Sequence, residues 1–172
     1  LRLDLTRVAG ELTLRIENDG APVKMSFEPE LPLGAKIGRA RVGDRDIAAS
    51  PVQQPQDTHA RVELDVPPGE TVLRLDYTGG VAIVPVTPRP VIGEASRAMK
   101  IVNVSLKDRV YTIEIDRAVA EPAHFELRTP WKIDSVQGAK FEALTPSSYR
   151  LTIDATHKRS QVLVMFAELA SQ

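Results

Sequence analysis

The sequence predicts an all-β protein built of antiparallel sheets, and three observations support this fold class. Apolar residues alternate with polar ones at a period of two in several short segments, as in strands with one buried face. Turn-forming residues separate these segments. The 172 residues also include 13 prolines and 10 glycines, which leave little room for an uninterrupted amphipathic helix.

The alternating segments are about five to eight residues long and rich in Val, Ile, Leu and Thr, as strands are. The clearest of them are residues 12–17, 62–66, 110–115 and 151–154. In the first, Leu12, Leu14 and Ile16 alternate with polar side chains. Each segment is therefore expected to turn its apolar face toward a core and its polar face toward water.

Turns follow where glycine or proline interrupts the alternation, as in Asn18-Asp19-Gly20, Pro67-Pro68-Gly69 and Thr78-Gly79-Gly80. The best helical segment, residues 93–99, is at most two turns long. Residues 50–56 contain two prolines and three glutamines and predict an exposed loop.

The two halves of the chain resemble each other, which predicts a tandem arrangement. Residues 13–17 match 112–116, residues 62–66 match 151–155, and residues 72–75 match 162–165. Two unrelated series of strands with similar spacing would also align in part, but we favour a duplication. Each copy holds about six or seven strands in about 75 to 85 residues, the size of a small immunoglobulin-like sandwich.

The sequence therefore predicts two tandem immunoglobulin-like antiparallel β-sandwiches. Residues 1–85 form the first, residues 86–98 a Pro-containing linker, and residues 99–172 the second. Pro88 and Pro90 favour extended backbone, so the linker is expected to be stiff. Because the chain starts at Leu1 and its first residues already alternate as a strand, we expect a fragment of a longer polypeptide or a mature product of cleavage.

Composition excludes several classes of function. Cysteine is absent, which rules out disulfides, zinc–thiolate sites, iron–sulfur clusters and a thiol nucleophile. Lys plus Arg is 22 against 23 for Asp plus Glu, a net charge of −1, which argues against nucleic acid or an anionic membrane as a partner. No apolar run approaches the roughly 18 residues needed for a membrane span.

No pattern in the chain points to catalysis. The three histidines, His59, His124 and His157, lack metal-ligand spacing, and no serine lies in a nucleophile elbow. The pattern Asp44-Arg45-Asp46 is typical of a hairpin turn rather than a calcium or glycosidase motif. We therefore expect no catalytic residue, no metal site and no cofactor, and we interpret the chain as not an enzyme.

Aromatic side chains are the remaining candidates for ligand binding, because sugars stack on exposed rings. Trp131, Tyr77 and Tyr149 are the candidates, although packing in the core or between domains is favoured for Trp131 and a structural role for Tyr149. The phase of the alternation places all four phenylalanines in the core: Phe27, Phe125, Phe141 and Phe166.

The segment of residues 20–84 resembles a known type of module. It runs APVKMSFEPELPLGAKI, then VGDR, then VELDVPPGETVLRLDY. This pattern resembles the C-terminal β-sandwich accessory domains of large bacterial glycoside hydrolases, especially those with an α-helical-barrel catalytic domain. The resemblance covers about 65 residues of turns and strands, and it carries no catalytic residue onto this chain. It implies a secreted protein, extracellular or periplasmic.

These observations lead to three functional hypotheses. The first is a non-catalytic accessory or structural module of a larger secreted or carbohydrate-active bacterial protein, whose partner is a neighbouring domain of the same polypeptide. The second is a carbohydrate-binding module with a polysaccharide partner. The third is a protein–protein adhesion module of the cell envelope, binding through a strand edge or through residues 50–59.

Overall fold

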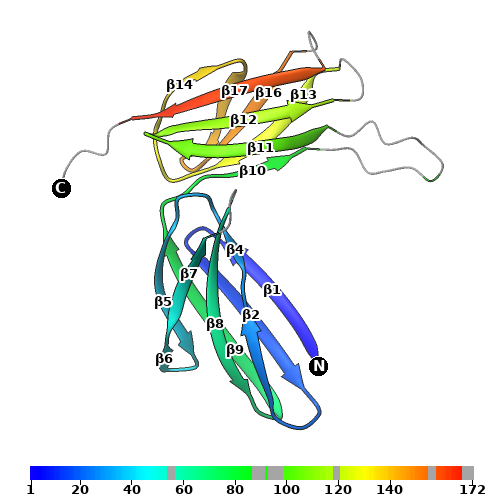
Figure 1. Ribbon diagram of the computed structural model, residues 1–172, viewed down its shortest axis with the longest axis vertical. Helices are drawn as coiled ribbons and strands as arrows, with labels where there is room; N and C mark the ends of the chain where they lie inside the picture. Colours follow the sequence, from blue (N-terminus) through cyan, green and yellow to red (C-terminus); the bar gives the residue numbers. More distant parts are fainter. Residues whose placement is uncertain (54–56, 87–91, 93–98, 118–120, 155–157, 168–172) are drawn as a thin grey trace. The chain divides into compact units, whose positions relative to one another are not determined.

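The computed structural model describes residues 1–53, 57–86, 92, 99–117, 121–154 and 158–167, and within them every regular element is a β-strand. The all-β prediction is confirmed, and paired strands run antiparallel throughout this part of the chain. The chain divides into two compact units, Leu1–Gly80 and Val81–Gln172 (Figure 1). The short helix expected at residues 93–99 falls almost wholly outside the described residues.

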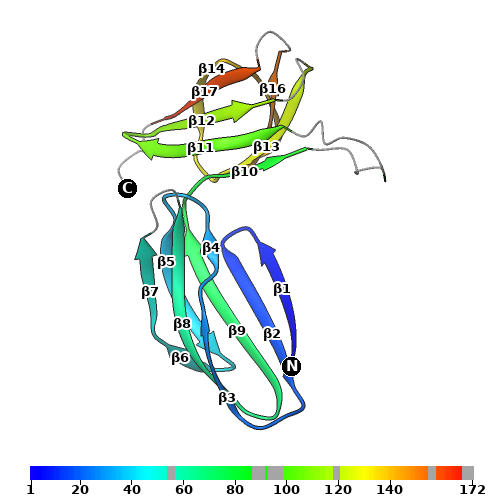
Figure 2. The same ribbon diagram turned by 45° about the vertical axis from the view of Figure 1, so that its right-hand side comes forward.

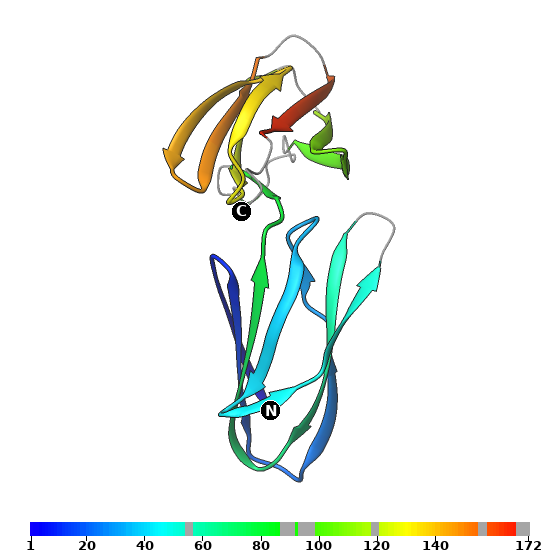
Figure 3. The ribbon, with the colours of Figure 1, turned by 90° about the vertical axis from the view of Figure 1, so that its left-hand side faces the viewer.

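The first unit consists of two sheets. Sheet 1a contains five strands in the order β1 (Arg2–Val8), β2 (Glu11–Asn18), β9 (Gly69–Thr78), β5 (Lys36–Val42) and β6 (Arg45–Ile47). Sheet 1b is built around β8 (Thr58–Val66), which pairs with β7 (Ala49–Gln53), β3 (Val23–Phe27) and β4 (Glu30–Leu31). Because β7 shares partners on β8 with both β3 and β4, those two strands lie on the other edge of β8. Figure 3 shows the two sheets of this unit as separate layers.

The predicted alternation places the core of the first unit between these sheets. On β2, Leu12, Leu14 and Ile16 are buried, while the polar residues between them are more exposed. Buried residues of β8 and β9 alternate in the same way and join one cluster. Each fully buried aliphatic side chain stabilises the fold by about 1.5–3 kcal/mol, so the shared core holds the two sheets together.

The prediction of an exposed loop at residues 50–56 was wrong for residues 50–53. These residues belong to β7, which pairs with β8 from Ala49 to Gln53. Proline reads as a strand breaker, but Pro51 lies on an edge strand, which needs hydrogen bonds on one side only. Residues 54–56 lie outside the described residues.

The second unit also consists of two sheets (Figure 2). Sheet 2a has the order β11 (Lys100–Lys107), β12 (Val110–Asp116), β17 (Arg159–Phe166) and β14 (Ile133–Gln137). Sheet 2b has the order β10 (Ala82–Pro85), β13 (Ala123–Arg128), β16 (Ser148–Ile153) and β15 (Lys140–Thr145). Both sheets contribute fully buried side chains, among them Tyr111, Ile113, Phe125, Leu127 and Leu151.

The two units share a strand order. Between sheets 1a and 2a, the order β1-β2-β9-β5 corresponds to β11-β12-β17-β14. Between sheets 1b and 2b, the order β7-β8-β3 corresponds to β15-β16-β13. The second unit has one additional strand, β10, on the free edge of β13. Residues 82–85, which the sequence analysis assigned to the end of the first sandwich, thus pair within the second unit. The expected linker at residues 86–98 lies mostly outside the described residues.

Candidate functional site

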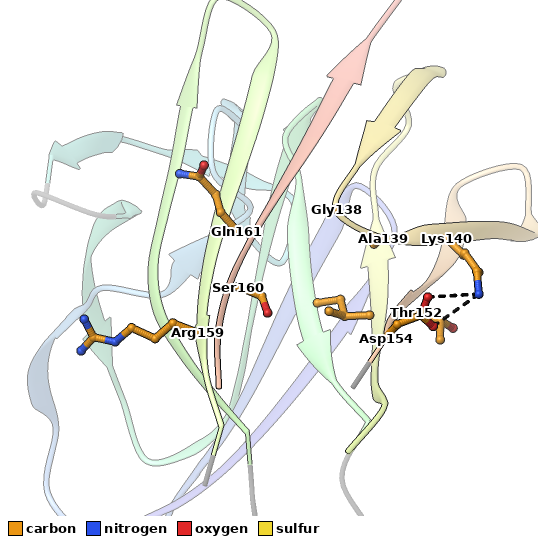
Figure 4. Close-up of a pocket in the computed structure, with 9 residues that line it drawn as sticks. Gly138, Ala139, Lys140, Thr152, Asp154, Arg159, Ser160 and Gln161 are labelled. Carbon is orange, nitrogen blue, oxygen red and sulfur yellow. Dashed lines mark hydrogen bonds and ion pairs between the residues drawn. The ribbon is translucent and has the colours of Figure 1, made fainter. Parts of the chain in front are cut away.

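A pocket of about 480 Å³ lies at one end of the second unit (Figure 4). We call it the end pocket. Three segments form it: the turn between β14 and β15, the end of β16, and the start of β17. Its lining residues are Gly138, Ala139, Lys140, Thr152, Ile153, Asp154, Arg159, Ser160 and Gln161.

A glycine brings the β14–β15 turn close to β17. Gly138 has a φ of +81°, a left-handed conformation that side chains other than glycine adopt at a cost. A Cβ atom at this position would overlap the backbone carbonyl oxygen of Gln161. The turn can therefore approach β17 this closely only because residue 138 has no side chain, and this approach closes one wall of the end pocket.

Charged side chains on one wall of the end pocket neutralise each other. Lys140 Nζ lies 3.2 Å from Asp154 Oδ2, and Figure 4 shows this pair on one side of the pocket. Both side chains are well exposed, so the pair contributes less than about 1 kcal/mol to stability. Because the Lys140–Asp154 pair lies on the wall of the end pocket, both side chains can exchange their mutual contact for hydrogen bonds to a polar ligand.

Behind the end pocket, a buried arginine connects β16 with β17. The guanidinium of Arg117 donates to the carbonyl oxygen of Asp154 at 3.2 Å and to Ser160 Oγ at 3.0 Å. It also donates to the carbonyl oxygen of Glu121 at 2.8 Å. Hydrogen bonds from a charged donor are stronger than neutral ones, so Arg117 holds this end of the unit in a defined shape.

The lining of the end pocket can form hydrogen bonds but offers no aromatic ring. Most of its lining residues carry hydroxyl, amide or charged side chains, and Ile153 is the one large apolar side chain in the lining. A second hollow of about 350 Å³ shares Arg159, Ser160 and Gln161 with it and adds Val102, Glu114 and Ile115. The side chains of both hollows offer hydrogen-bond donors and acceptors to a polar, hydroxyl-rich molecule.

The aromatic candidates from the sequence do not line the end pocket. Trp131 is half-buried and packs edge-on against Phe166, with ring centroids 5.2 Å apart and an interplanar angle of 67°. Tyr77 is buried in the first unit, and its hydroxyl donates to the carbonyl oxygen of Val8 at 3.2 Å. Tyr149 is half-buried on β16, opposite Leu127 on β13. Trp131 and Tyr77 therefore contact other residues of their own units, and none of the three rings is fully exposed.

The expectation that all four phenylalanines lie in the core was wrong for Phe141, which is 45% exposed. Phe125 and Phe166 are buried, and Phe27 packs against the core of the first unit. Phe141 pairs with Leu151, so it does lie on the inward phase of its strand. However, β15 is the edge strand of sheet 2b, and an inward side chain at an edge is not fully covered.

A charged cluster on the first unit was not predicted. His59 Nδ1 lies 3.1 Å from the carbonyl oxygen of Glu28, and His59 Nε2 lies 3.2 Å from Asp57 Oδ1. Arg61 Nε donates to Glu28 Oε1 at 2.5 Å. The hydrogen bond to the Glu28 carbonyl, followed by the nearby Asp57 carboxylate, raises the pKa of His59. Sequence spacing carries no signal for this cluster, because strand pairing brings Glu28 to β8 from about 30 residues away.

The other two histidines do not join this cluster. His124 is exposed on β13, with Nδ1 lying 3.2 Å from Thr152 Oγ1, and His157 lies outside the described residues. In the described part of the chain, His, Asp and Glu side chains form no group of three or more that could hold a metal ion. Nor do these residues include a helix long and apolar enough to cross a membrane.

Comparisons with known proteins found no matching family model, no matching curated protein and no matching solved structure.

Proposed function

We propose that this chain is a non-catalytic accessory or structural module of a larger secreted or carbohydrate-active bacterial protein. The observation that carries the proposal is that its chemically distinctive side chains are used within the fold. Trp131 packs on Phe166, the Tyr77 hydroxyl bonds a backbone carbonyl, and the buried Arg117 donates to Ser160 and to two backbone carbonyls. Side chains used in this way build a rigid support, which suits a module that braces a neighbouring domain.

The proposal includes a tandem arrangement of two related sandwiches. The shared strand order supports it, because both sheets of one unit have counterparts in the other. An immunoglobulin-like fold is a more specific prediction than a β-sandwich. In immunoglobulin domains one sheet has the strand order A, B, E, D, so the fifth strand (E) lies beside the second strand (B). Here the last strand of each unit, β9 or β17, lies beside β2 or β12. We therefore propose tandem sandwiches that share this order rather than the immunoglobulin order.

The likeness of residues 20–84 to accessory domains of large bacterial glycoside hydrolases supports an extracellular or periplasmic location. In that setting the partner of the module is a neighbouring domain of the same polypeptide. The test is to express residues 1–172 alone and assay a panel of glycosides. We expect no turnover above that of a heat-denatured sample. Turnover that a single carboxylate substitution in this chain abolishes would overturn the proposal.

The second candidate function is carbohydrate binding, and the end pocket favours it. Its hydroxyl, amide and charged groups can exchange hydrogen bonds with sugar hydroxyls. Calorimetric titration with soluble polysaccharides tests this candidate. Binding that Gln161→Ala weakens and Gln137→Ala leaves unchanged would support it, because both side chains are exposed and only Gln161 lines the pocket. Equal effects of the two substitutions would count against it.

A further inference from the structure

The first unit leaves apolar side chains exposed on the inner face of its edge strand β1. Leu3 and Leu5 are 52% and 53% exposed. They pair with Ile16 and Leu14, which lie in the core. Because paired residues in neighbouring strands point to the same face, both leucines point toward the interior side of sheet 1a. Their exposure therefore reflects a missing cover rather than an outward orientation.

The edge of the opposite sheet shows the same feature. On β3, Val23, Met25 and Phe27 pair with Val66, Leu64 and Val62, all three of which are buried. Yet Val23 is 40% exposed, and Met25 and Phe27 are only half-buried.

The two edges face each other on one side of the unit. Arg7 on β1 donates from Nη2 to the carbonyl oxygen of Glu30 on β4, at 2.5 Å. Since β3 and β4 lie on the same edge of β8, this bond places β1 beside that edge. We call the resulting apolar stripe the open edge: Leu3, Leu5, Val23, Met25 and Phe27.

The second unit shows what covers the corresponding place. There β13, the counterpart of β3, carries β10 on its free edge. Ile83 of β10 pairs with Leu127, and Pro85 pairs with Phe125. Phe125 and Leu127 on β13 are completely buried, whereas Met25 and Phe27 on β3 are only half-buried. Among the described residues of the first unit, no strand occupies the free edge of β3.

Other sheet edges carry features that discourage further pairing. β6 is only three residues long, and β7 and β10 contain prolines. The pairing of β11, β14 and β15 is interrupted by register shifts. In contrast, β3 and β1 pair in unbroken register and contain no proline. These two strands therefore lack prolines and register shifts, while carrying charged side chains such as Lys24 and Asp4.

We propose that the open edge binds an extended peptide strand, which adds to β3 antiparallel as β10 adds to β13. The free backbone groups of β3 supply the hydrogen bonds of this β-strand addition. The partner strand carries apolar side chains opposite Met25 and Phe27 and no charge at those two positions, because a charge buried there would be unpaired. The proposal goes beyond the accessory function and does not depend on it.

The test adds such a strand to the full chain. A copy of residues 81–99 is fused directly before Leu1, which places the added strand about as far along the chain from β1 as β10 is from β11. In hydrogen exchange, we expect the amides of β3 that do not bond to β8 to slow at least about tenfold relative to the unfused chain. Unchanged exchange at β3 would overturn the proposal.

Three variants of the fused chain test the register. In the first, Ile83→Asp is made within the added copy only, so the folded units keep their own residues. This fusion should lose the protection of β3, and retained protection would overturn the proposal. In the other two, Met25→Lys on the inner face should abolish protection in the fused chain, while Ser26→Lys on the outer face should preserve it.

The competing occupant is a second copy of the chain that pairs through β1. Sedimentation of the unfused chain between about 1 µM and about 1 mM spans the range of weak association. The proposal expects a monomer whose β3 amides exchange rapidly. A dimer with slowed exchange at β1 and unchanged exchange at β3 would overturn it.

Discussion

Asn18 and Arg117 occupy corresponding positions in the two units and perform the same structural task with different chemistry. Asn18 ends β2, Arg117 directly follows β12, and each is only 4% exposed. Asn18 Nδ2 donates to the carbonyl oxygen of Val66 at the end of β8. Arg117 donates to the carbonyl oxygen of Asp154 just beyond β16. Each side chain thus connects one sheet of its unit to the end of an inner strand, β8 or β16, in the opposite sheet.

This correspondence follows the repeat seen in the sequence. Residues 13–17 match 112–116, so the next residue in each copy is Asn18 or Arg117. Backbone carbonyls at buried strand ends need donors, because an unpaired one costs about 1–3 kcal/mol. The position is therefore constrained to carry a long or branched donor, but the kind of donor is free to differ.

Replacing Asn18 with a carboxylate should destabilise the first unit more than removing its side chain. Asn18→Ala loses the donor and should lower the free energy of unfolding by about 1–3 kcal/mol. Asn18→Asp should cost more near pH 7, because its charge would face the carbonyls of Ala21, Val66 and Pro67. Urea unfolding measures both, and at about pH 3 protonation of the carboxyl should narrow the difference. A less stable alanine variant at pH 7 would contradict this assignment.

Two phenylalanines on the inward phase of sheet 2b should differ sharply in their contribution to stability. Phe125→Ala should cost about 3–5 kcal/mol, because the ring is completely buried. Phe141→Ala should cost less than about 1 kcal/mol, because its ring is about half exposed at an edge strand. Urea unfolding of the two variants, monitored by the fluorescence of Trp131, compares their free energies of unfolding. Similar losses would show that β15 is more deeply covered than its exposure indicates.

The close approach at the end pocket predicts a cost for filling position 138. Gly138→Ala combines a left-handed backbone with an overlap on the Gln161 carbonyl, so we expect a loss of at least about 2 kcal/mol. Gly43→Ala is the control: its φ is +59°, but nothing lies within 4 Å of the added carbon. The control should lose only about 1 kcal/mol. Chemical denaturation of both variants measures the difference, and equal losses would remove the steric argument.

The environment of His59 predicts a pH dependence of stability. Its pKa is raised, first by the bond to the Glu28 carbonyl and then by Asp57, so folding favours the protonated ring. The stabilisation is complete below the unfolded value of about 6.5 and is lost as pH rises through the higher folded pKa. Wild type should therefore exceed His59→Asn in stability by more at about pH 5.5 than at about pH 8.5. Urea unfolding at both pH values measures this difference in stability. A difference between wild type and His59→Asn that grows as pH rises would contradict the prediction.

Much of the strand pattern could be predicted from the sequence, because alternation reports which face of a strand is apolar. Leu12, Leu14 and Ile16 are buried as expected, and so is Phe125. The predictions of burial and of strand positions were wrong where the neighbouring strands of the sheet determine whether a residue is covered or paired. Phe141 has the correct phase but lies at an edge, and Pro51 belongs to a strand because only one of its sides is paired.

The candidate site could not be predicted, because its members come from distant segments. Lys140 and Asp154 are ordinary surface charges in the sequence, and they line one pocket because β15 pairs with β16. Gly43 and Gly138 occupy matching places in the two halves of the sequence, which indicates a turn at each but not the contact of Gly138 with Gln161.

By itself, the sequence determined that this protein is all-β, and its internal matches indicated which strands correspond, because period-two alternation and turn residues are local properties of the chain. Only the tertiary structure decided that β10 pairs with β13, while the equivalent edge of β3 is left uncovered. Strand pairing joins residues far apart in the chain, and the backbone hydrogen bonds that form it are the same for every residue type except proline. Local pattern therefore reveals which face of a strand is buried, but not which neighbour completes its sheet.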